Sequence, residues 1–532
     1  MKRIAILILA LSALTLTGAA TSASKAKPLC VGGPGCYPTL AAALAASNDG
    51  DTVRVNPGTY AGGVAIVHSI TLQGAGAGKT IISGGGPVLT LGVYRASTEP
   101  TISIDGVTVT GGHTTTSAES RDFVEEDGVF AYGGGIDIPP NSDFSGGAGV
   151  SISNSAITGN EATPTVTLGC TQPCDPFALA AGGGIYNSGH LRLRNTSVDH
   201  NTSGGPTASK AIGGGILSTS QGSSLTVENS TVSDNRASVA DPNGVQATGA
   251  GILSETGDFV VRNSVITRNR SELASTKSSV DGPFFANAAG IGCDRSATIT
   301  NSRIDGNVAT ASDPNGQPGA FDSGMGCGSS RGALILQNSS VSGNQAIANV
   351  ADTTDSGPDG TALELDDTAT VTDTIIAGNT ATVTTKGGIA GAQGAVLNFA
   401  FDPSRPATIS NSVIRDNTMS ATSITGSASV QGGGIANSGA LTLHNVVISG
   451  NSGRANGDGG FAQGAGVWNG SLFGSDPSAL ILDGTVVTGN SLFASATIPI
   501  LGAGIYSDGL SPTLTHTVVA HNNPDQCFGL SC

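Results

Sequence analysis

Two short phrases alternate along this chain, and their spacing restricts the fold more than any other feature of the sequence. The first is a glycine-rich phrase that ends in an apolar residue, and successive copies lie 31 to 49 residues apart. Those apolar residues are Ile136, Ile185, Ile216, Ile252, Ile291, Met325, Leu363, Leu397, Ile435, Val467 and Ile505. Repeats of this length are typical of solenoids, in which each repeat forms one turn of a coil.

The second phrase resembles Asn-Ser-x-Ile-x-x-Asn and always ends in asparagine. Its final residues are Asn160, Asn201, Asn235, Asn269, Asn307, Asn344, Asn379, Asn417, Asn451, Asn490 and Asn522. A related column contains Asn154, Asn195, Asn229, Asn263, Asn301, Asn338, Asp373, Asn411 and Asn445, where each short strand must bend. Asparagine tolerates left-handed backbone geometry, and stacked amides can hydrogen-bond to one another. We therefore expect a structural role for these columns.

Each repeat alternates apolar and polar residues over strands of four to six residues, without helices between them. In the repeat at 182–201, Ile185, Asn187, Leu191 and Leu193 are expected to point inward and Tyr186 outward. The pattern predicts an all-β, right-handed parallel β-helix of about thirteen coils. The longer segments between each final Asn and the next glycine-rich phrase are expected to emerge as loops on one side, where they could build a groove wall.

The chain begins with features of an exported protein. Residues 1–23 have the charged start, apolar stretch and small-residue exit of a signal peptide. Residues 24–62 are expected to form an N-terminal loop, a capping helix starting near Thr39 and a strand, and residues 63–532 the repeats. The apolar stretch is too short to span a bilayer, and no later stretch is long enough. We expect a monomer located outside the cell or in the periplasm.

Charge and cysteine usage exclude several other classes. With 23 basic against 39 acidic residues and a net charge of −16, nucleic-acid binding is not expected. The eight cysteines form close pairs, which in an exported protein favours disulfides over a metal site. The predicted bonds join Cys30 to Cys36, Cys170 to Cys174, Cys293 to Cys327 and Cys527 to Cys532. Cys293 and Cys327 both follow the apolar column by two residues, so they should stack on neighbouring coils. No cofactor is expected, and calcium stays an alternative that the short acidic loops supply with few ligands.

The chain resembles the right-handed parallel β-helix proteins of the pectin-lyase-like superfamily, of the bacterial exported and adhesin-like type. The resemblance rests on Thr39, the stretch Asp51–Tyr60, Ile70–Gly76 and the repeated phrases, and it covers roughly residues 30–530. It implies the fold but not an activity, because the superfamily holds lyases, hydrolases, esterases and non-catalytic surface proteins. The full set of polygalacturonase-like or pectinesterase-like signatures is absent, with Asp366-Asp367 a lone partial match.

An acidic constellation is the candidate catalytic site. Glu255, Asp294 and Asp366 each follow the apolar column by three residues, and Glu364 lies two residues before Asp366. Glu255 and Asp294 would be one coil apart, roughly 5 Å, and Asp294 and Asp366 two coils apart, roughly 10 Å. These distances are typical of glycoside hydrolases, and Arg295 could serve a lyase. The alternative is chance alignment on a solvated face.

An aromatic constellation is the candidate ligand-binding site. Tyr186, Trp468 and Tyr506 each follow the apolar column by one residue, and an exposed Trp/Tyr pair would form a stacking platform for a sugar ring. The alternative is aromatic packing that shields the sheet. The sequence thus predicts an exported, non-catalytic protein that binds polysaccharide or another cell surface. A polysaccharide lyase or glycoside hydrolase is the second hypothesis, and a scaffold without a ligand the third.

Overall fold

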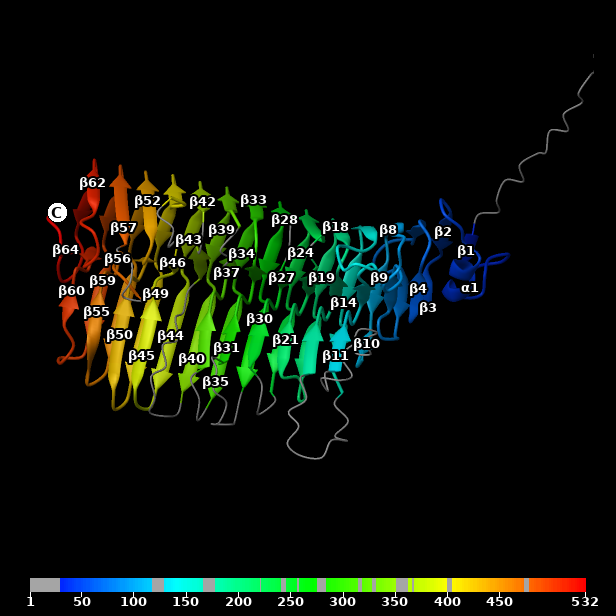
Figure 1. Ribbon diagram of the computed structural model, residues 1–532, viewed down its shortest axis with the longest axis horizontal. Helices are drawn as coiled ribbons and strands as arrows, with labels where there is room; N and C mark the ends of the chain where they lie inside the picture. Colours follow the sequence, from blue (N-terminus) through cyan, green and yellow to red (C-terminus); the bar gives the residue numbers. More distant parts are fainter. Residues whose placement is uncertain are drawn as a thin grey trace, which may run out of the picture.

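The chain folds into an elongated right-handed parallel β-helix in the computed structural model (Figure 1). The structure describes residues 29–116, 129–165, 178–220, 222–240, 245–255, 258–274, 284–313, 318–327, 332–350, 362–365, 368–399, 404–472 and 478–532. The predicted signal peptide, Cys170, Cys174 and Asp366 lie outside these residues. In the described part of the chain, no helix is long and apolar enough to cross a membrane.

Most coils contain five strands in the described residues. One coil consists of β18 (His190–Arg194), β19 (Ser197–Asp199), β20 (Thr202–Gly205), β21 (Lys210–Ile212) and β22 (Ile216–Ser218). The first, second and fifth strands belong to three long sheets, here called the first, second and third sheet. They contain 15, 14 and 14 strands, slightly more than the thirteen coils predicted.

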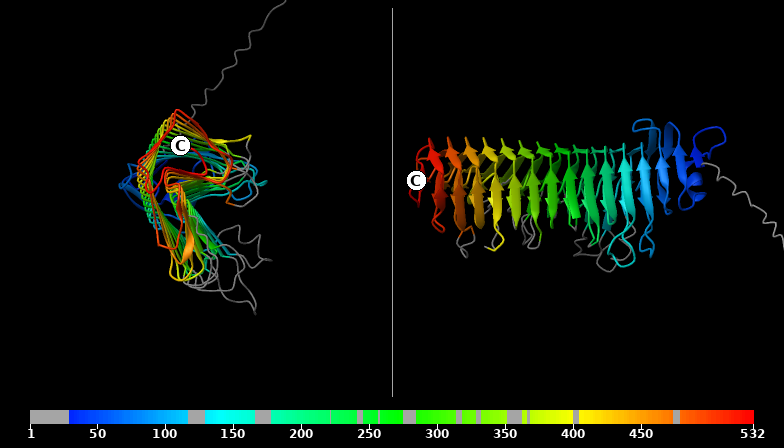
Figure 2. Two further views of the ribbon diagram at one scale, coloured as in Figure 1. Left: turned by 90° about the vertical axis from the view of Figure 1, so that its left-hand side faces the viewer. Right: turned by 90° about the horizontal axis from the view of Figure 1, so that it is seen from above.

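The other two strands of each coil form an arm that projects from the triangular body (Figure 2). Its outgoing strands form one 11-stranded sheet, and its returning strands form sheets of six and four strands. The arm comprises the segments between each final Asn and the next glycine-rich phrase. The expectation that these segments emerge only as loops was therefore wrong, because their described parts pair with the same segments of neighbouring coils.

Apolar columns fill the triangular body. Ile185, Leu191, Leu193 and Val198 are all at most 2% exposed, as the alternation predicted. Each such side chain contributes about 2–3 kcal/mol of hydrophobic stabilisation, as an upper estimate. One member of the predicted column was misplaced, since Val396 and not Leu397 pairs with Ile435. Its phrase has one residue fewer, and this shifts Leu397 to the outer face.

The column of final asparagines, from Asn160 to Asn522, forms a buried ladder between the second sheet and the arm. The side-chain amide of Asn307 donates to Asn344 Oδ1 at 3.0 Å and to the carbonyl of Ile266 at 3.1 Å. Its own oxygen accepts from the backbone and the side chain of Asn269. The same contacts continue from Asn160 to Asn522. This ladder satisfies polar backbone groups at the bend, which otherwise would be buried without partners.

The related asparagine column at the strand bends, which begins with Asn154, has a different role. Asn195, Asn301 and Asn445 have positive φ angles of 48° to 53°, as do the other members of the column. They form the sharp bend between the first and second sheets, as predicted. Among the described residues, amide contacts along this column are few, such as Asn195 to Asn154 at 3.3 Å. Left-handed geometry and a continuous ladder therefore belong to two different columns.

The glycine-rich phrase forms the neck through which the chain leaves the arm. A Cβ atom on Gly183 would lie 2.3 Å from the backbone of Thr202, and one on Gly184 would lie 2.9 Å from the side-chain amide of Asn201. Gly182 has a φ of +63°. The two repeated phrases of the sequence therefore pack against each other at the neck, where no room remains for a side chain.

A disulfide links two neighbouring coils. Cys293 and Cys327 are bonded between adjacent strands of the third sheet, with Cα atoms 4.5 Å apart, as the sequence predicted. The same inward column carries a hydrogen bond from Asn187 to Ser218 on earlier coils. Later in the column, side-chain amides again contact one another. Polar side chains thus take the place of the disulfide elsewhere in this column.

The other three predicted cysteine pairs are close in the sequence. Cys30 is bonded to Cys36 and Cys527 to Cys532, so these two predictions are confirmed. The fourth pair has a different outcome. Cys170 and Cys174 lie outside the described residues, which means that the structure does not test the disulfide predicted between Cys170 and Cys174. That bond stays a prediction.

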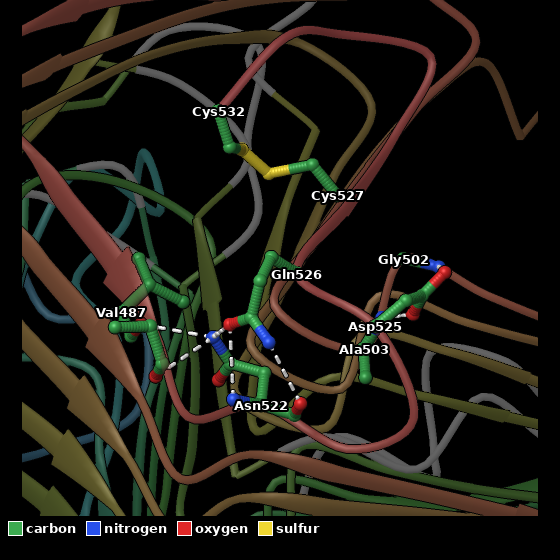
Figure 3. Close-up of a disulfide and its surroundings, with 9 residues drawn as sticks. Val487, Gly502, Ala503, Asn522, Asp525, Gln526, Cys527 and Cys532 are labelled. Carbon is green, nitrogen blue, oxygen red and sulfur yellow. Dashed lines mark hydrogen bonds between the residues drawn. A yellow bond between two sulfur atoms is a disulfide. The ribbon is translucent and has the colours of Figure 1, made fainter.

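The N-terminal end is covered by α1 (Leu40–Ala45), whose Leu40 and Leu44 are buried. Thr39 caps this helix by accepting a hydrogen bond from the Ala42 amide. At the C-terminal end, Gln526 takes the place of the next asparagine in the ladder, since its side-chain oxygen accepts from Asn522 (Figure 3). The Asp525 carboxylate accepts from the Gly502 and Ala503 amides. Each end of the β-helix is thus covered by residues that lie next to a short disulfide loop.

Candidate functional site

The outer face of the third sheet meets the returning strands of the arm along a boundary that we call the corner. Figure 2 shows the arm projecting from the body at an angle. Two separate apolar clusters fill parts of this corner. The first contains Tyr132, Ala181, Tyr186, Ile212, Leu217 and Leu253, and the second contains Leu397, Ala436, Trp468 and Tyr506. The clusters bind the arm to the triangular body.

The three predicted sugar-stacking aromatics belong to these clusters and are buried. Trp468 is 1% exposed, and Tyr186 and Tyr506 are each 7% exposed. The indole Nε1 donates to Gln463 Oε1 at 3.1 Å, so even the polar atom of Trp468 has a partner on the arm. Tyr186 stacks on Tyr132 with ring centroids 4.4 Å apart. The expectation of an exposed platform was wrong, because the arm covers the outer face of the third sheet.

The apolar lining is interrupted in the middle of the corner. The outward column of the third sheet reads Leu253, Gly292, Gly326, Glu364 and Leu397 on successive coils. Two glycines and a carboxylate thus separate the two apolar clusters. We call the interruption at Gly292, Gly326 and Glu364 the polar gap.

The coils at the polar gap also differ from other coils in the glycine-rich phrase that forms the neck of the arm. Ala288 and Asp322 replace the first glycine of the phrase and have φ angles of 48°. Asp322 is 4% exposed, and its carboxylate occupies the space where a side chain on Gly326 would lie. The Asp322 carboxylate thus fills the space over Gly326, whereas Leu253 and Ala288 fill the space over Gly292.

The structure brings two of the three predicted catalytic residues together beside the gap. Glu255 donates its backbone amide to Ser218 O, and Asp294 donates its own to Ser254 O, so the two acidic residues follow the same strand on adjacent coils. The predicted one-coil separation, about 5 Å, agrees with this register. Asp366, the third member, lies outside the described residues.

The two carboxylates have different surroundings. Glu255 is partly buried and accepts a 2.9 Å hydrogen bond from Thr219 Oγ1. Asp294 remains accessible to solvent, but surrounding protein displaces enough water to raise its pKa above 3.8. The negative charge of Glu255 raises this pKa further, while Lys210 and Arg295 oppose the rise. Desolvation and a like charge both favour the protonated form of an acid.

Polar side chains of the arm face the same region. Lys210 is on β21 of the arm and lies within electrostatic range of Asp294. On the following returning strands, Gln246 donates to Thr248 Oγ1 at 2.8 Å, and Thr248 in turn donates to Asn287. The gap therefore presents carboxylates from the third sheet together with an ammonium, amides and a hydroxyl from the arm. Such a set can bind hydroxyl-rich ligands or transfer a proton.

Sequence reasoning missed a second site, a cavity of about 510 Å³ on the outer face of the first sheet. Its lining residues are Arg192, Ser224, Thr226, Glu228, Asp258, Phe259, Val260, Arg262, Ser296 and Thr298. The sequence contained a signal for it, because Arg194, Glu228 and Arg262 occupy the same strand position in three successive repeats. No group of three or more His, Cys, Asp or Glu side chains among the described residues could hold a metal ion.

Comparisons with known proteins give only distant structural similarities. No family model and no curated protein matches the chain. The A-module of Azotobacter vinelandii mannuronan C-5 epimerase AlgE6 is 14% identical with a TM-score of 0.33, over 90% of this chain and 93% of the module. The AlgE4 A-module from the same organism is 14% identical with a TM-score of 0.30, over 92% and 91%.

A double mutant of the periplasmic alginate epimerase AlgG is 12% identical with a TM-score of 0.29, over 87% of this chain and 78% of AlgG. Because these sequence identities and TM-scores are low, the fold is assigned from the strand register of the chain itself. The candidate site is likewise described from the residues of this chain.

Proposed function

We propose that this protein is exported and binds a polysaccharide chain in the corner between the arm and the third sheet. The observation that carries the proposal is the polar gap, where Glu255 and Asp294 lie on adjacent coils opposite Lys210. Carboxylates accept hydrogen bonds from sugar hydroxyls, whereas amides and an ammonium can donate to ring and glycosidic oxygens. A corner that continues along many coils suits a polymer better than a small molecule.

Export is supported by the cysteines and by the first residues of the chain. Disulfides persist in oxidising compartments and are rare in the cytosol, and the structure contains three of them. The signal-like residues 1–23 agree with this assignment. An adhesin-like role at a cell surface remains part of the proposal.

A second candidate function, glycoside hydrolysis, uses the same pair of carboxylates. It is favoured by the pKa of Asp294, which burial and the neighbouring Glu255 raise. Backbone positions on adjacent coils are about 4.8 Å apart. This spacing allows the carboxyl separation of about 5 Å found in retaining enzymes, in which one group acts as the acid and the other as the nucleophile. Asp294 would be the acid, and Glu255, held by Thr219, the nucleophile. The lyase hypothesis with Arg295 has no comparable geometric support.

The test measures binding and product formation with the same variants. Glu255→Gln and Asp294→Asn preserve size and remove charge, and Asp458→Asn changes an exposed acidic residue on a distant part of the arm as a control. Retention on insoluble polysaccharides and release of reducing ends are measured for each protein. Binding that falls about tenfold without any product supports the binding function.

Product formation that disappears in both gap variants but not in the control would support hydrolysis instead. Binding of a polysaccharide that is unchanged in both gap variants would remove the corner as the site. Failure of the full-length protein to bind any neutral, acidic or basic polysaccharide would contradict the proposed function itself.

A further inference from the structure

The cavity on the first sheet has a floor and two chemically different rims. Thr226 and Val260 lie side by side on adjacent strands and form part of the floor. Glu228 and Arg262 lie in register along one rim, and the exposed Asp258 lies on the other. Arg192 is in register with Thr226, and its guanidinium group reaches Glu228 from the neighbouring strand. This face is separate from the corner, because the first and third sheets form different sides of the triangular body.

A carboxylate of the protein itself lies between the two arginines. Arg192 Nη2 donates to Glu228 Oε2 at 2.7 Å, and Arg262 Nη1 lies 3.8 Å from Glu228 Oε1. The side chains of Arg192 and Arg262 are 58% and 51% exposed, whereas that of Glu228 is only 16% exposed. Glu228 therefore lies beneath two guanidinium groups whose remaining donors face solvent.

Arginine is concentrated here although the protein as a whole is acidic. Only 23 of 532 residues are Lys or Arg, and the net charge is −16. Arg194 pairs in register with Glu228, and Glu228 with Arg262, so Glu228 lies on a strand flanked on one side by Arg192 and Arg194 and on the other by Arg262. Planar guanidinium groups bind carboxylates and other oxyanions through paired hydrogen bonds. The cavity lining holds two arginines and two carboxylates, so it carries no net negative charge on an otherwise acidic protein, and its exposed guanidinium groups can attract an anionic ligand.

We infer that this cavity binds an anionic group of a glycan, a carboxylate or a sulfate ester, and that Glu228 competes with that group for Arg192 and Arg262. The ligand anion takes the solvent-facing donors of the two arginines, while its sugar ring lies over the methyl groups of Thr226 and Val260. Asp258 on the opposite rim repels a second negative charge and so orients the ligand. The inference does not depend on the proposed function of the corner.

Competition by Glu228 gives this site an unusual mutational signature. Removing either arginine with Arg192→Gln or Arg262→Gln weakens anion binding by about tenfold or more, because a hydrogen bond to a charged group is lost. Glu228→Gln has the opposite effect and strengthens binding about threefold or more, since both guanidinium groups lose their internal partner. A site that needed Glu228 to hold the sugar would lose affinity in that variant.

The experiment is isothermal titration of the full chain with oligosaccharides of equal length. The probes are a polyuronate, a sulfated glucan and a neutral glucan, with inorganic sulfate as a fourth arm. Arg236→Gln is the matched control, because Arg236 makes a comparable ion pair with Glu272 on the arm, away from the cavity. Circular dichroism and the thermal midpoint verify that every variant is folded.

The expected result is binding of at least one anionic oligosaccharide, weaker in both arginine variants, stronger in Glu228→Gln and unchanged in Arg236→Gln. The polyuronate and sulfate arms identify which anion is preferred, and binding of inorganic sulfate alone would mean that no sugar is recognised and would overturn the glycan assignment. Equal binding of the neutral glucan, no binding of any probe, or weaker binding by Glu228→Gln would also overturn the inference.

Discussion

The triangular body and the arm are built from the same coils, yet they are stabilised in different ways. Large aliphatic side chains such as Ile185 and Leu193 fill the body. The interior of the arm is lined mainly by small residues, among them Ala211, Ala247 and Ala286, which are completely buried. Two strands of the arm can therefore approach closely, but each coil of the arm buries much less apolar surface than a coil of the body.

This difference places the candidate site at the boundary between the two regions. The body supplies rigid outward positions at a spacing of about 4.8 Å, and the arm covers most of them with apolar contacts. Where Gly292 and Gly326 interrupt those contacts, the carboxylates of Glu255 and Asp294 face the polar residues of the arm. The site thus depends on a local change of packing at a boundary that otherwise repeats regularly.

Trp468→Ala is expected to have the largest effect on the attachment of the arm. The variant removes a buried indole and its hydrogen bond to Gln463, which should lower the free energy of unfolding by about 3–5 kcal/mol. Chemical denaturation followed by circular dichroism measures the loss. A stability loss below about 1 kcal/mol would mean that the indole is accessible and would revive the sugar-stacking interpretation.

Asn307→Ala tests the ladder at the neck. It removes the acceptor of the Asn269 backbone amide, one of the two acceptors of the Asn269 side-chain amide and the side-chain donor to the Ile266 carbonyl, all in a buried place, at a cost of about 3 kcal/mol. Asn301→Ala, at an exposed left-handed bend, should cost only about 1 kcal/mol. Equal losses from the two variants in denaturant unfolding would contradict the division of roles between the asparagine columns.

Ala211→Leu tests whether the arm interior is tightly packed. The added atoms should strain the contact between outgoing and returning strands and destabilise the protein by about 1–3 kcal/mol. Thr418→Val, on the exposed face of the arm strand β49 (Thr418–Ser423), serves as the control and should be nearly neutral. Hydrogen exchange should report the loss in the arm first. Uniform loss of protection in the body would show that the two regions unfold together.

The smallest effect is expected from Asp294→Asn. The folded-state pKa of Asp294 is raised, so ionisation destabilises the folded protein as pH rises from about 4 through that pKa. The variant should therefore be more stable than the parent at pH 7, by no more than about 1 kcal/mol because the group is accessible to solvent. The two proteins should be equally stable near pH 3. A larger difference at pH 3 than at pH 7 would reverse the assigned sign.

The sequence predicted the parts of this molecule that repeat. Ile185, Asn187, Leu191 and Leu193 point inward as the alternation indicated, and the left-handed bend column was placed correctly. The adjacency of Glu255 and Asp294 and the bond between Cys293 and Cys327 followed from counting residues within the repeat. Counting failed at Leu397, because one missing residue in its phrase shifts the register.

Other features could not be predicted because they depend on segments of variable length. The stretch between each final Asn and the next glycine-rich phrase is rich in small residues and has little periodicity, so its pairing into an arm was not evident. Without the arm, Trp468 and Tyr506 appeared as exposed outward residues. Because the arm was not predicted, Lys210 was not expected to lie near Asp294.

The sequence by itself determined the coil. A residue type that recurs at a fixed place in every turn meets its own copies on neighbouring turns, so spacing alone establishes the core columns, the ladder and the inter-coil disulfide. The tertiary structure decided which outward positions meet solvent, since that depends on how the arm folds back against the third sheet. It also decided where the apolar contacts of the corner are interrupted, and this interruption is where we propose that the ligand binds.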